Sequence, residues 1–145
     1  MPPSATLQRV VEGMARAAHP WWIIGSCAVA AHETATTVED VDVLFDLRDQ
    51  DVVRAAGARL ARGVSDGRFC SALHARWMGS GFPVEFMADL HVATEAGWSP
   101  IRPSSREMRC LAGIVLPVPD RVDLIHMLIR FGREKDHARV ALLTA

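Results

Sequence analysis

The sequence predicts an α/β (α+β) fold, in which helices flank a mixed β-sheet, as one domain over residues 1–145. Helical patterns alternate with short apolar runs in the first half of the chain, and a β-hairpin pattern follows. Helices that alternate with strands cover the faces of a sheet, and the hairpin adds antiparallel pairing. The length of 145 residues suits one domain, and 50% of the residues are hydrophobic, which is enough for a buried core.

The first half of the chain predicts two helices and two strands around a tight turn. Apolar side chains recur at helical spacing up to His19-Pro20, which ends the first helix. Gly25 allows a tight turn, and Ser26 is a good N-cap for the helix that follows. In chain order we expect a helix at residues 6–18, a buried strand at 21–24, a short helix at 27–32, a loop at 34–38 and a strand at 40–45.

The second half predicts a hairpin and a helical C-terminus. Gly79-Ser80-Gly81 is a turn signal between two strand-like runs, and Asp120 precedes an amphipathic run as a cap. In chain order we expect a helix from Asp49 or Asp51 to Leu60, a loop at 63–67, paired strands at 69–78 and 84–87, an irregular segment at 88–105, a strand at 111–118, and two helices separated by Gly132-Arg133.

Composition excludes several classes of protein. The formal net charge of −1 argues against a basic nucleic-acid-binding face. The three cysteines show no CxxC spacing, so we expect neither a disulfide framework nor a zinc site. This cysteine usage favours a reducing compartment. No apolar run reaches the length of about 18 residues that a membrane helix needs. We therefore expect a soluble cytoplasmic protein, and the high Ala and Arg usage fits a GC-rich bacterial gene.

Two aspartates open the predicted strand at residues 40–45. Residues i and i+2 of a strand share a face, so the carboxylates of Asp40 and Asp42 point the same way and repel each other. A divalent cation is the expected compensation. A second pair, Asp49 and Asp51, lies at a predicted helix start, where carboxylates serve as caps.

Two further features extend the first pair into a candidate phosphoryl-transfer site. The turn at Gly25-Ser26 precedes a helix, and a helix N-terminus binds anions. Glu85 lies in the next convincing apolar strand. Phosphate donors at a helix N-terminus, with carboxylates on adjacent strands, are the parts of a two-metal phosphoryl-transfer site.

These residues resemble the signature of the nucleotidyltransferase superfamily with the DNA polymerase β-type fold. That signature is hG[GS], then Dh[DE]h, then a carboxylate on a neighbouring strand, where h is hydrophobic. Ile24-Gly25-Ser26 matches the first element, and Asp40-Val41-Asp42-Val43 matches the second after thirteen intervening residues. Glu85 matches the third. Small bacterial members, including antibiotic nucleotidyltransferases, also resemble this chain at Ala28-Val29, at His32 and at Arg133-Glu134-Lys135-Asp136.

The resemblance implies an enzyme that transfers a nucleoside monophosphate from an NTP to an acceptor hydroxyl. Asp40 and Asp42 would hold Mg²⁺ (or Mn²⁺), and Glu85 would complete a metal site and accept the acceptor's proton. Gly25 and Ser26 would bind the β- and γ-phosphates, with Lys135 as a basic contact. Family acceptors are small molecules such as aminoglycosides or lincosamides, partner proteins, or tRNA, which the near-neutral charge disfavours here. Because a chain this short leaves little protein for binding the acceptor, a homodimer or a partner protein is expected to complete the cleft.

The chain departs from the family pattern at two basic positions. Small members usually carry an Arg in the loop before the aspartates, where this chain has Thr36, and a Lys near the position of Leu128. His126 or Arg130 are the candidates to replace them. Two alternatives therefore stay open: a non-catalytic module of the same fold that holds a nucleotide or a partner protein, such as a toxin–antitoxin component, and a generic α/β domain with coincidental carboxylates.

The remaining candidates are interpreted as structural before functional. His32 either faces the nucleotide or satisfies a local carbonyl, and Cys27 is expected to be a small buried residue. Trp77 and Trp98 are candidates to line an acceptor pocket. Metal ligation is not expected at four histidines that lack ligand spacing, namely His19, His74, His91 and His137.

Overall fold

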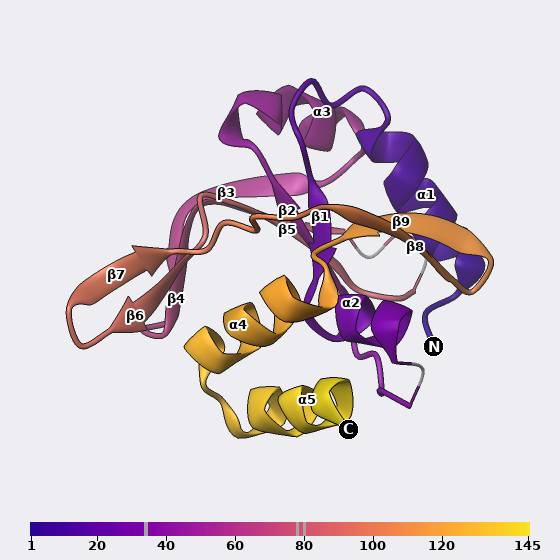
Figure 1. Cartoon of the computed structure of the whole chain (residues 1–145). Coiled ribbons are helices and arrows are strands. Elements are labelled where there is room, and N and C mark those ends of the chain that lie inside the picture. Colours follow the sequence, from indigo (N-terminus) through magenta and orange to yellow (C-terminus); the bar gives the residue numbers. More distant parts are fainter. Residues whose placement is uncertain (34, 78, 80) are drawn as a thin grey trace.

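The computed structural model describes residues 1–33, 35–77, 79 and 81–145 (Figure 1). Three predicted features reach residues outside that set: the loop at 34–38 at Thr34, the end of the strand at 69–78 at Met78, and the turn at Ser80. The elements, in chain order, are α1 (Ser4–Met14), β1 (Trp22–Ile24), α2 (Gly25–His32), β2 (Val41–Phe45), the 3₁₀ helix η1 (Leu47–Asp49), α3 (Gln50–Ala55), β3 (Arg59–Ser65), β4 (Phe69–Trp77), β5 (Val84–Ala88), β6 (His91–Thr94), β7 (Gly97–Pro100), β8 (Glu107–Leu111), β9 (Ile114–Val118), α4 (Arg121–Phe131) and α5 (Glu134–Thr144).

The main sheet is mixed, as predicted. Its strands follow the order β1-β2-β5-β4-β6-β7, with β3 paired to β4. The pairing of β2 with β5 is parallel, whereas β4 and β5 form the predicted antiparallel pair. Parallel neighbours need a crossover, and the chain between β2 and β5 supplies it through α3, β3 and β4.

The two faces of the sheet differ in what covers them. One face of β2 carries Val41, Val43 and Phe45, all buried in the core, as are Leu7 and Val10 of α1. Figure 1 shows α1 with α3 on one side of the central strands, and α2, α4 and α5 gathered on the other. The other face of β2 begins with Asp42, which stays half-buried rather than packed.

Several predicted elements are wrong in extent or type, among them the loop at 63–67, whose first three residues belong to β3. The helix predicted to include Leu60 ends at Ala55, because Gly57 adopts a φ of +93° and turns the chain into β3. The segment at residues 88–105 is not irregular throughout, since it contains the β6–β7 hairpin. The strand predicted at residues 111–118 is one half of the β8–β9 hairpin, which turns at Ala112-Gly113.

The C-terminal helices begin and end as the sequence predicts. The Asp120 side chain accepts a hydrogen bond from the Asp123 backbone and caps α4. Gly132 ends α4 in the left-handed conformation with a φ of +68°, and its N–H donates to the Leu128 carbonyl. Within the described residues, no helix combines the length and the apolar character that crossing a membrane requires.

Asp49 has a different role from the one predicted for it. Its side chain does not cap α3. Instead, its buried carboxylate accepts the backbone N–H groups of Ala18 and His19, each at 3.0 Å. This long-range contact fixes the chain after α1 in a non-helical path, so α1 ends at Met14 rather than at the predicted Ala18.

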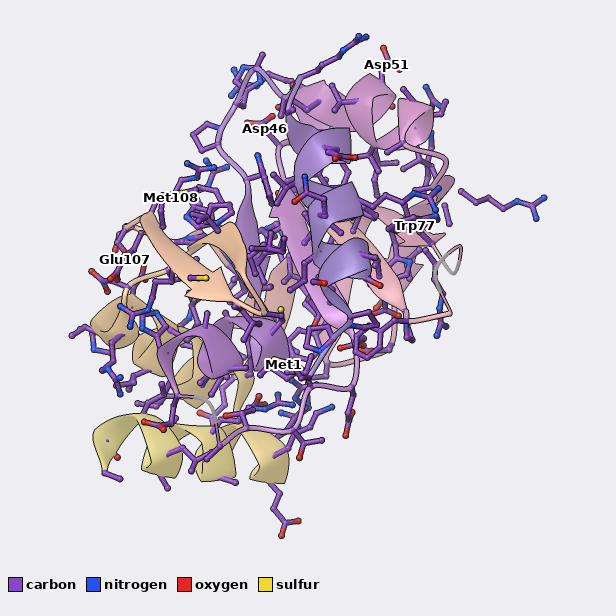
Figure 2. All side chains as sticks on the ribbon, turned by 90° about the vertical axis from the view of Figure 1, so that its right-hand side faces the viewer. Met1, Asp46, Asp51, Trp77, Glu107 and Met108 are labelled. Atoms are coloured by element: carbon purple, nitrogen blue, oxygen red, sulfur yellow. The ribbon has the colours of Figure 1, made fainter. Side chains whose placement is uncertain are left out.

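We expect Asp49→Ala to lower the free energy of unfolding by about 1.5–3 kcal/mol, because it removes two part-buried backbone hydrogen bonds to a buried carboxylate. Asp51→Ala is the matched control, since Asp51 pairs only with Arg54 among the described residues and projects from α3 into solvent (Figure 2). We expect that variant to stay within about 0.5 kcal/mol of the wild type. Urea unfolding measures both, and equal losses would contradict this assignment.

Candidate functional site

Three carboxylates converge at the start of β2 and β5. Asp42 lies on β2 directly opposite Glu85 on the parallel strand β5. Asp40 precedes β2, which begins at Val41 rather than at Asp40 as predicted. One ligand oxygen from each of the three residues lies within 4.8 Å of the others, and all three residues are half-buried. The structure therefore brings together the carboxylates that the sequence singled out.

Gly25 and Ser26 form the start of α2 beside this cluster. Gly25 has a φ of +65°, which favours glycine, and a Cβ at this position would lie 2.5 Å from Oδ2 of Asp42, so any other residue would have to displace that carboxylate. Ser26 is not the N-cap predicted for it, because α2 already begins at Gly25 and the cap residue is Ile24. The Ser26 hydroxyl is buried and has no hydrogen-bond partner among the described residues. An orphaned buried hydroxyl beside a helix N-terminus suits a bound anion.

A basic group from the start of α5 lines the same cleft. Arg133, Lys135 and Arg139 all contribute to a cleft of about 340 Å³ that includes the three carboxylates and Ser26. Asp136 is fully buried, and its carboxylate accepts two hydrogen bonds from Arg133. One comes from Nε at 2.6 Å and the other from a terminal guanidinium nitrogen at 3.0 Å. Arg139 reaches the same carboxylate at 3.5 Å. Asp136 thus holds two guanidinium groups at the cleft.

Arg133 and Arg139 line the cleft but were not predicted as site residues, although Arg133 opens the Arg133-Glu134-Lys135-Asp136 motif. Both lie three positions from Asp136 on opposite sides, and this spacing places them on one helix face with it. That pattern is the signal that could have found them. The two positions where the family pattern expects basic residues hold Thr36 and the fully buried Leu128.

The suggested replacements for those basic residues do not reach the cleft. Arg130 donates hydrogen bonds to the Ser99 hydroxyl and to the Pro100 carbonyl, which commits it to β7. His126 is exposed on α4 and is not among the cleft-lining residues.

Electrostatics in the carboxylate cluster are unfavourable without a cation. Burial, and then the nearby charges of Asp40 and Glu85, raise the pKa of Asp42 to about 8. Burial, followed by the charge of Glu85, raises the pKa of Asp40 as well. The interaction with His74, whose Nε2 lies 3.9 Å from Oε2 of Glu85, lowers the pKa of Glu85. The cluster therefore retains a proton near neutral pH unless a cation replaces it.

The donor set fits a hard divalent cation. All three groups offer carboxylate oxygens, which are the ligands that Mg²⁺ and Mn²⁺ prefer. A bound cation also removes the like-charge repulsion that raises the pKa values of Asp40 and Asp42. Of the histidines for which metal ligation was not expected, His74 lies beside Glu85 and lines the cleft.

The other candidate residues have structural surroundings. A ring nitrogen of His32 lies 2.8 Å from the Pro119 carbonyl oxygen, so the local-carbonyl interpretation applies. Cys27 is fully buried, and burial raises the pKa of its thiol to about 12, which keeps it protonated. Trp77 is buried beneath the Arg9 guanidinium, and neither it nor the exposed Trp98 lines the cleft.

Comparison with solved structures identifies the fold. No family model and no curated protein matches the sequence. A candidate nucleotidyltransferase from Thermotoga maritima superposes with a TM-score of 0.76 at 19% identity, over 95% of this chain and 89% of that one. The antibiotic-resistance factor ANT(2'')-Ia gives 0.65 at 12% identity, over 96% and 80% of the two chains.

A third solved structure extends the likeness. The lincosamide antibiotic adenylyltransferase LnuA, bound to lincomycin, gives a TM-score of 0.58 at 14% identity, over 98% of this chain and 94% of that one. The chain therefore has the nucleotidyltransferase fold, as the motif at Gly25-Ser26, Asp40, Asp42 and Glu85 predicted.

The pH dependence of stability tests the carboxylate cluster. The raised pKa of Asp42 means that the folded protein binds more protons than the unfolded chain between about pH 4 and pH 8. Without metal, stability should fall as pH rises through that window. Asp42→Asn should then be more stable than the wild type at pH 8 by about 1 kcal/mol or more, with little difference at pH 4.

Thermal unfolding in EDTA and in Mg²⁺ measures this effect. Mg²⁺ should raise the Tm of the wild type and not that of Asp42→Asn. Asp66→Asn is the control of opposite sign, because backbone hydrogen bonds from Phe69 and Arg68 lower the Asp66 pKa. A wild-type Tm in EDTA that rises between pH 4 and pH 8 would contradict the repulsive cluster.

Gly25→Ala should disrupt the site through a single methyl group. Gly67→Ala is its control, because Gly67 has a φ of +89° but nothing lies within 4 Å of the place that an added methyl group would take. In both variants the free energy of unfolding should fall by about 1 kcal/mol, because alanine is unfavourable in the left-handed backbone conformation. Only Gly25→Ala should also displace the Asp42 carboxylate and abolish the Mg²⁺-dependent rise in Tm. Retention of that rise in Gly25→Ala would show that Asp42 does not require this close approach.

Proposed function

We propose that this chain is a Mg²⁺- or Mn²⁺-dependent nucleotidyltransferase, which transfers a nucleoside monophosphate from an NTP to an acceptor hydroxyl and releases pyrophosphate. The observation that carries the proposal is one cleft in which Asp40, Asp42 and Glu85 share space with Arg133, Lys135 and Arg139. Carboxylates that hold cations, beside cations that hold phosphates, are what phosphoryl transfer needs.

Each residue has a role that follows from its chemistry. Asp40, Asp42 and Glu85 would hold the metal, which when bound neutralises charge on the transferring phosphoryl group. The Ser26 hydroxyl, which has no partner among the described residues, would donate to a phosphate oxygen, and the Gly25 backbone would allow that close approach. Lys135 and Arg139 would neutralise charge on the departing pyrophosphate.

In the proposed transfer step, Glu85 would act as the general base. The acceptor oxygen would form a bond to the α-phosphorus as the bond to the pyrophosphate oxygen breaks. The proton of the acceptor hydroxyl would pass to Glu85, whose lowered pKa keeps it ionised. His74, 3.9 Å from Oε2 of Glu85, would hold that carboxylate in place.

The acceptor classes come from the fold neighbours and from the family resemblance. One ANT(2'')-Ia structure holds adenylyl-2''-tobramycin, and the LnuA structure holds lincomycin. A small-molecule acceptor is therefore the first choice here, ahead of a partner protein or tRNA. A homodimer or a partner chain would complete the cleft, and the cytoplasm would be the site of action.

A nucleotide- or partner-binding module of the same fold is the second candidate, because Thr36 and Leu128 stand where family members carry basic residues. The buried Thr36 hydroxyl has no hydrogen-bond partner among the described residues, so that loop differs from the family pattern. Arg133 and Arg139 at the cleft weigh against this candidate, because they supply cationic groups from α5 instead.

Asp40→Ala should abolish Mg²⁺-dependent, acceptor-dependent pyrophosphate release while leaving the fold intact, because Asp40 is only half-buried at the start of a strand. The assay combines labelled NTPs, Mg²⁺ and a panel of aminoglycosides, lincosamides, tRNA and candidate partner proteins. Asp51→Ala is the control and should retain wild-type turnover. NTP binding without turnover on any acceptor would favour the binding module, and absence of NTP binding would contradict both.

A further inference from the structure

Two arginines continue the row of carboxylates across the sheet. On β5, Glu85 lies between Asp42 of β2 and Arg76 of β4. Arg76 in turn lies opposite Arg59 of β3. Residues directly opposite one another on paired strands project from the same face. The row therefore reads Asp42, Glu85, Arg76, Arg59 along the face that carries the candidate site.

Exposure along β4 agrees with this assignment. Leu73, Ala75 and Trp77 are buried on one face of β4. Of the alternate residues on the other face, His74 is half-buried and Arg76 is exposed. His74 lines the cleft, and Arg76 lies one step further along the same face. Arg59 opens β3 and Arg76 lies near the end of β4, so both are at the end of this strand pair that adjoins Glu85 on β5.

The two arginines differ in their surroundings, because Arg76 faces Glu85 and acts on it electrostatically, whereas Arg59 faces Arg76 on its paired side. Neither makes an ion pair or a hydrogen bond with a residue that the structure describes. By contrast, Arg54 pairs with Asp51, and Arg62 of β3 donates to Gln50 from the opposite face. Glu85 interacts with His74 at 3.9 Å, and it also interacts electrostatically with Arg76, which lies opposite it on β4.

The stability of the sheet does not account for the two arginines lying opposite each other. Like charges directly opposite each other destabilise a sheet, so the pair carries a cost. Charged residues also protect edge strands from pairing with other chains, which would explain Arg59. Arg76 lies on β4 where that strand is paired on both sides, so the opposite charge of Glu85 stabilises it from β5 while Arg59 repels it from β3. An anion that bridges the two guanidinium groups would offset their repulsion.

We propose that Arg76 and Arg59 bind an anionic group of the acceptor, so that the acceptor is a small hydroxyl compound that carries a phosphate or a carboxylate. This inference rests on the proposed transfer reaction, with the acceptor hydroxyl at Glu85. Adjacent strands are about 4.8 Å apart, so the anionic group lies roughly 5–10 Å from the reacting hydroxyl. Guanidinium groups match phosphate and carboxylate oxygens with paired hydrogen bonds.

The size and charge of the site favour a small molecule over a nucleic acid. Two arginines provide for one anionic group, and the net charge of the chain is −1. Glu39 and Asp66 also line the cleft and would repel a polyanion. A polycation such as tobramycin would instead place its ammonium groups against Arg76 and Arg59, which is unfavourable.

Binding without nucleotide tests the inference separately from the transfer reaction. Isothermal titration would measure glycerol 3-phosphate, uncharged glycerol, tobramycin, lincomycin and a short single-stranded oligonucleotide against the wild-type protein. We expect glycerol 3-phosphate to bind with a higher affinity than the other four ligands. We also expect this affinity to fall as NaCl is added. Tighter binding of tobramycin or lincomycin would overturn the proposal, and tighter binding of the oligonucleotide would replace the small acceptor with a nucleic acid.

The variants are Arg76→Gln and Arg59→Gln, with Arg62→Gln as the control on the same strand as Arg59 and the opposite face. Each of the first two should weaken glycerol 3-phosphate binding about tenfold or more, and the control should not. All three should keep the wild-type affinity for Mg²⁺ and NTP. Equal affinity for glycerol 3-phosphate in Arg76→Gln and the wild type would overturn the proposal. Absence of NTP binding in the wild type would instead contradict the proposed function and leave the anion result standing.

Discussion

The parallel pairing of β2 with β5 is the constraint on which the site depends. Its register sets Asp42 opposite Glu85, and the antiparallel pairing with β1 sets Ile24 opposite Asp42. The same register therefore places Gly25, the next residue, against the Asp42 carboxylate. A slip of one residue would turn Glu85 to the covered face of the sheet and would separate the carboxylates. The buried residues of β2 and β5 on that face resist such a slip, because the slip would expose them.

The like charges held by this register are balanced by α5. Asp136 is fully buried, yet it is paired with both Arg133 and Arg139, so it is not an uncompensated charge. The two guanidinium groups and one carboxylate leave a net positive charge at the cleft, to which Lys135 adds. Arg133 and Arg139 both counteract the raised pKa of Asp42. The helix thus carries positive groups of the cleft, and the strands β2 and β5 carry negative groups.

The parts of the site that lie in short, local motifs were predictable from sequence. Gly25-Ser26 and Asp40-Val41-Asp42 carry their chemistry within a few residues, and the signature identified the fold that the solved structures confirm. Contacts between distant segments were not predictable. The end of α1 depends on the Asp49 carboxylate, and His74 reaches Glu85 only through the pairing of β4 with β5. The β6–β7 hairpin was missed because it is largely exposed and lacks the apolar alternation that marks a half-buried strand.

The basic groups in the cleft and those on the neighbouring strands differ in how firmly they are held, and under the proposed reaction this difference would separate the two substrates. Every NTP presents the same triphosphate, so a fixed set of cations suits it, and Asp136 fixes Arg133 and Arg139. The ligands of the solved neighbours differ, and the strand next to Glu85, β4, carries Arg76, beside which β3 places Arg59. Neither arginine makes a hydrogen bond or a close ion pair with a residue in the described part of the chain, although Arg76 acts on Glu85 electrostatically. Those arginines are positively charged and would repel a polycationic acceptor. The likeness to proteins that hold adenylyl-2''-tobramycin or lincomycin therefore extends to the fold, whereas under our proposal the charge on the neighbouring strands would select the acceptor.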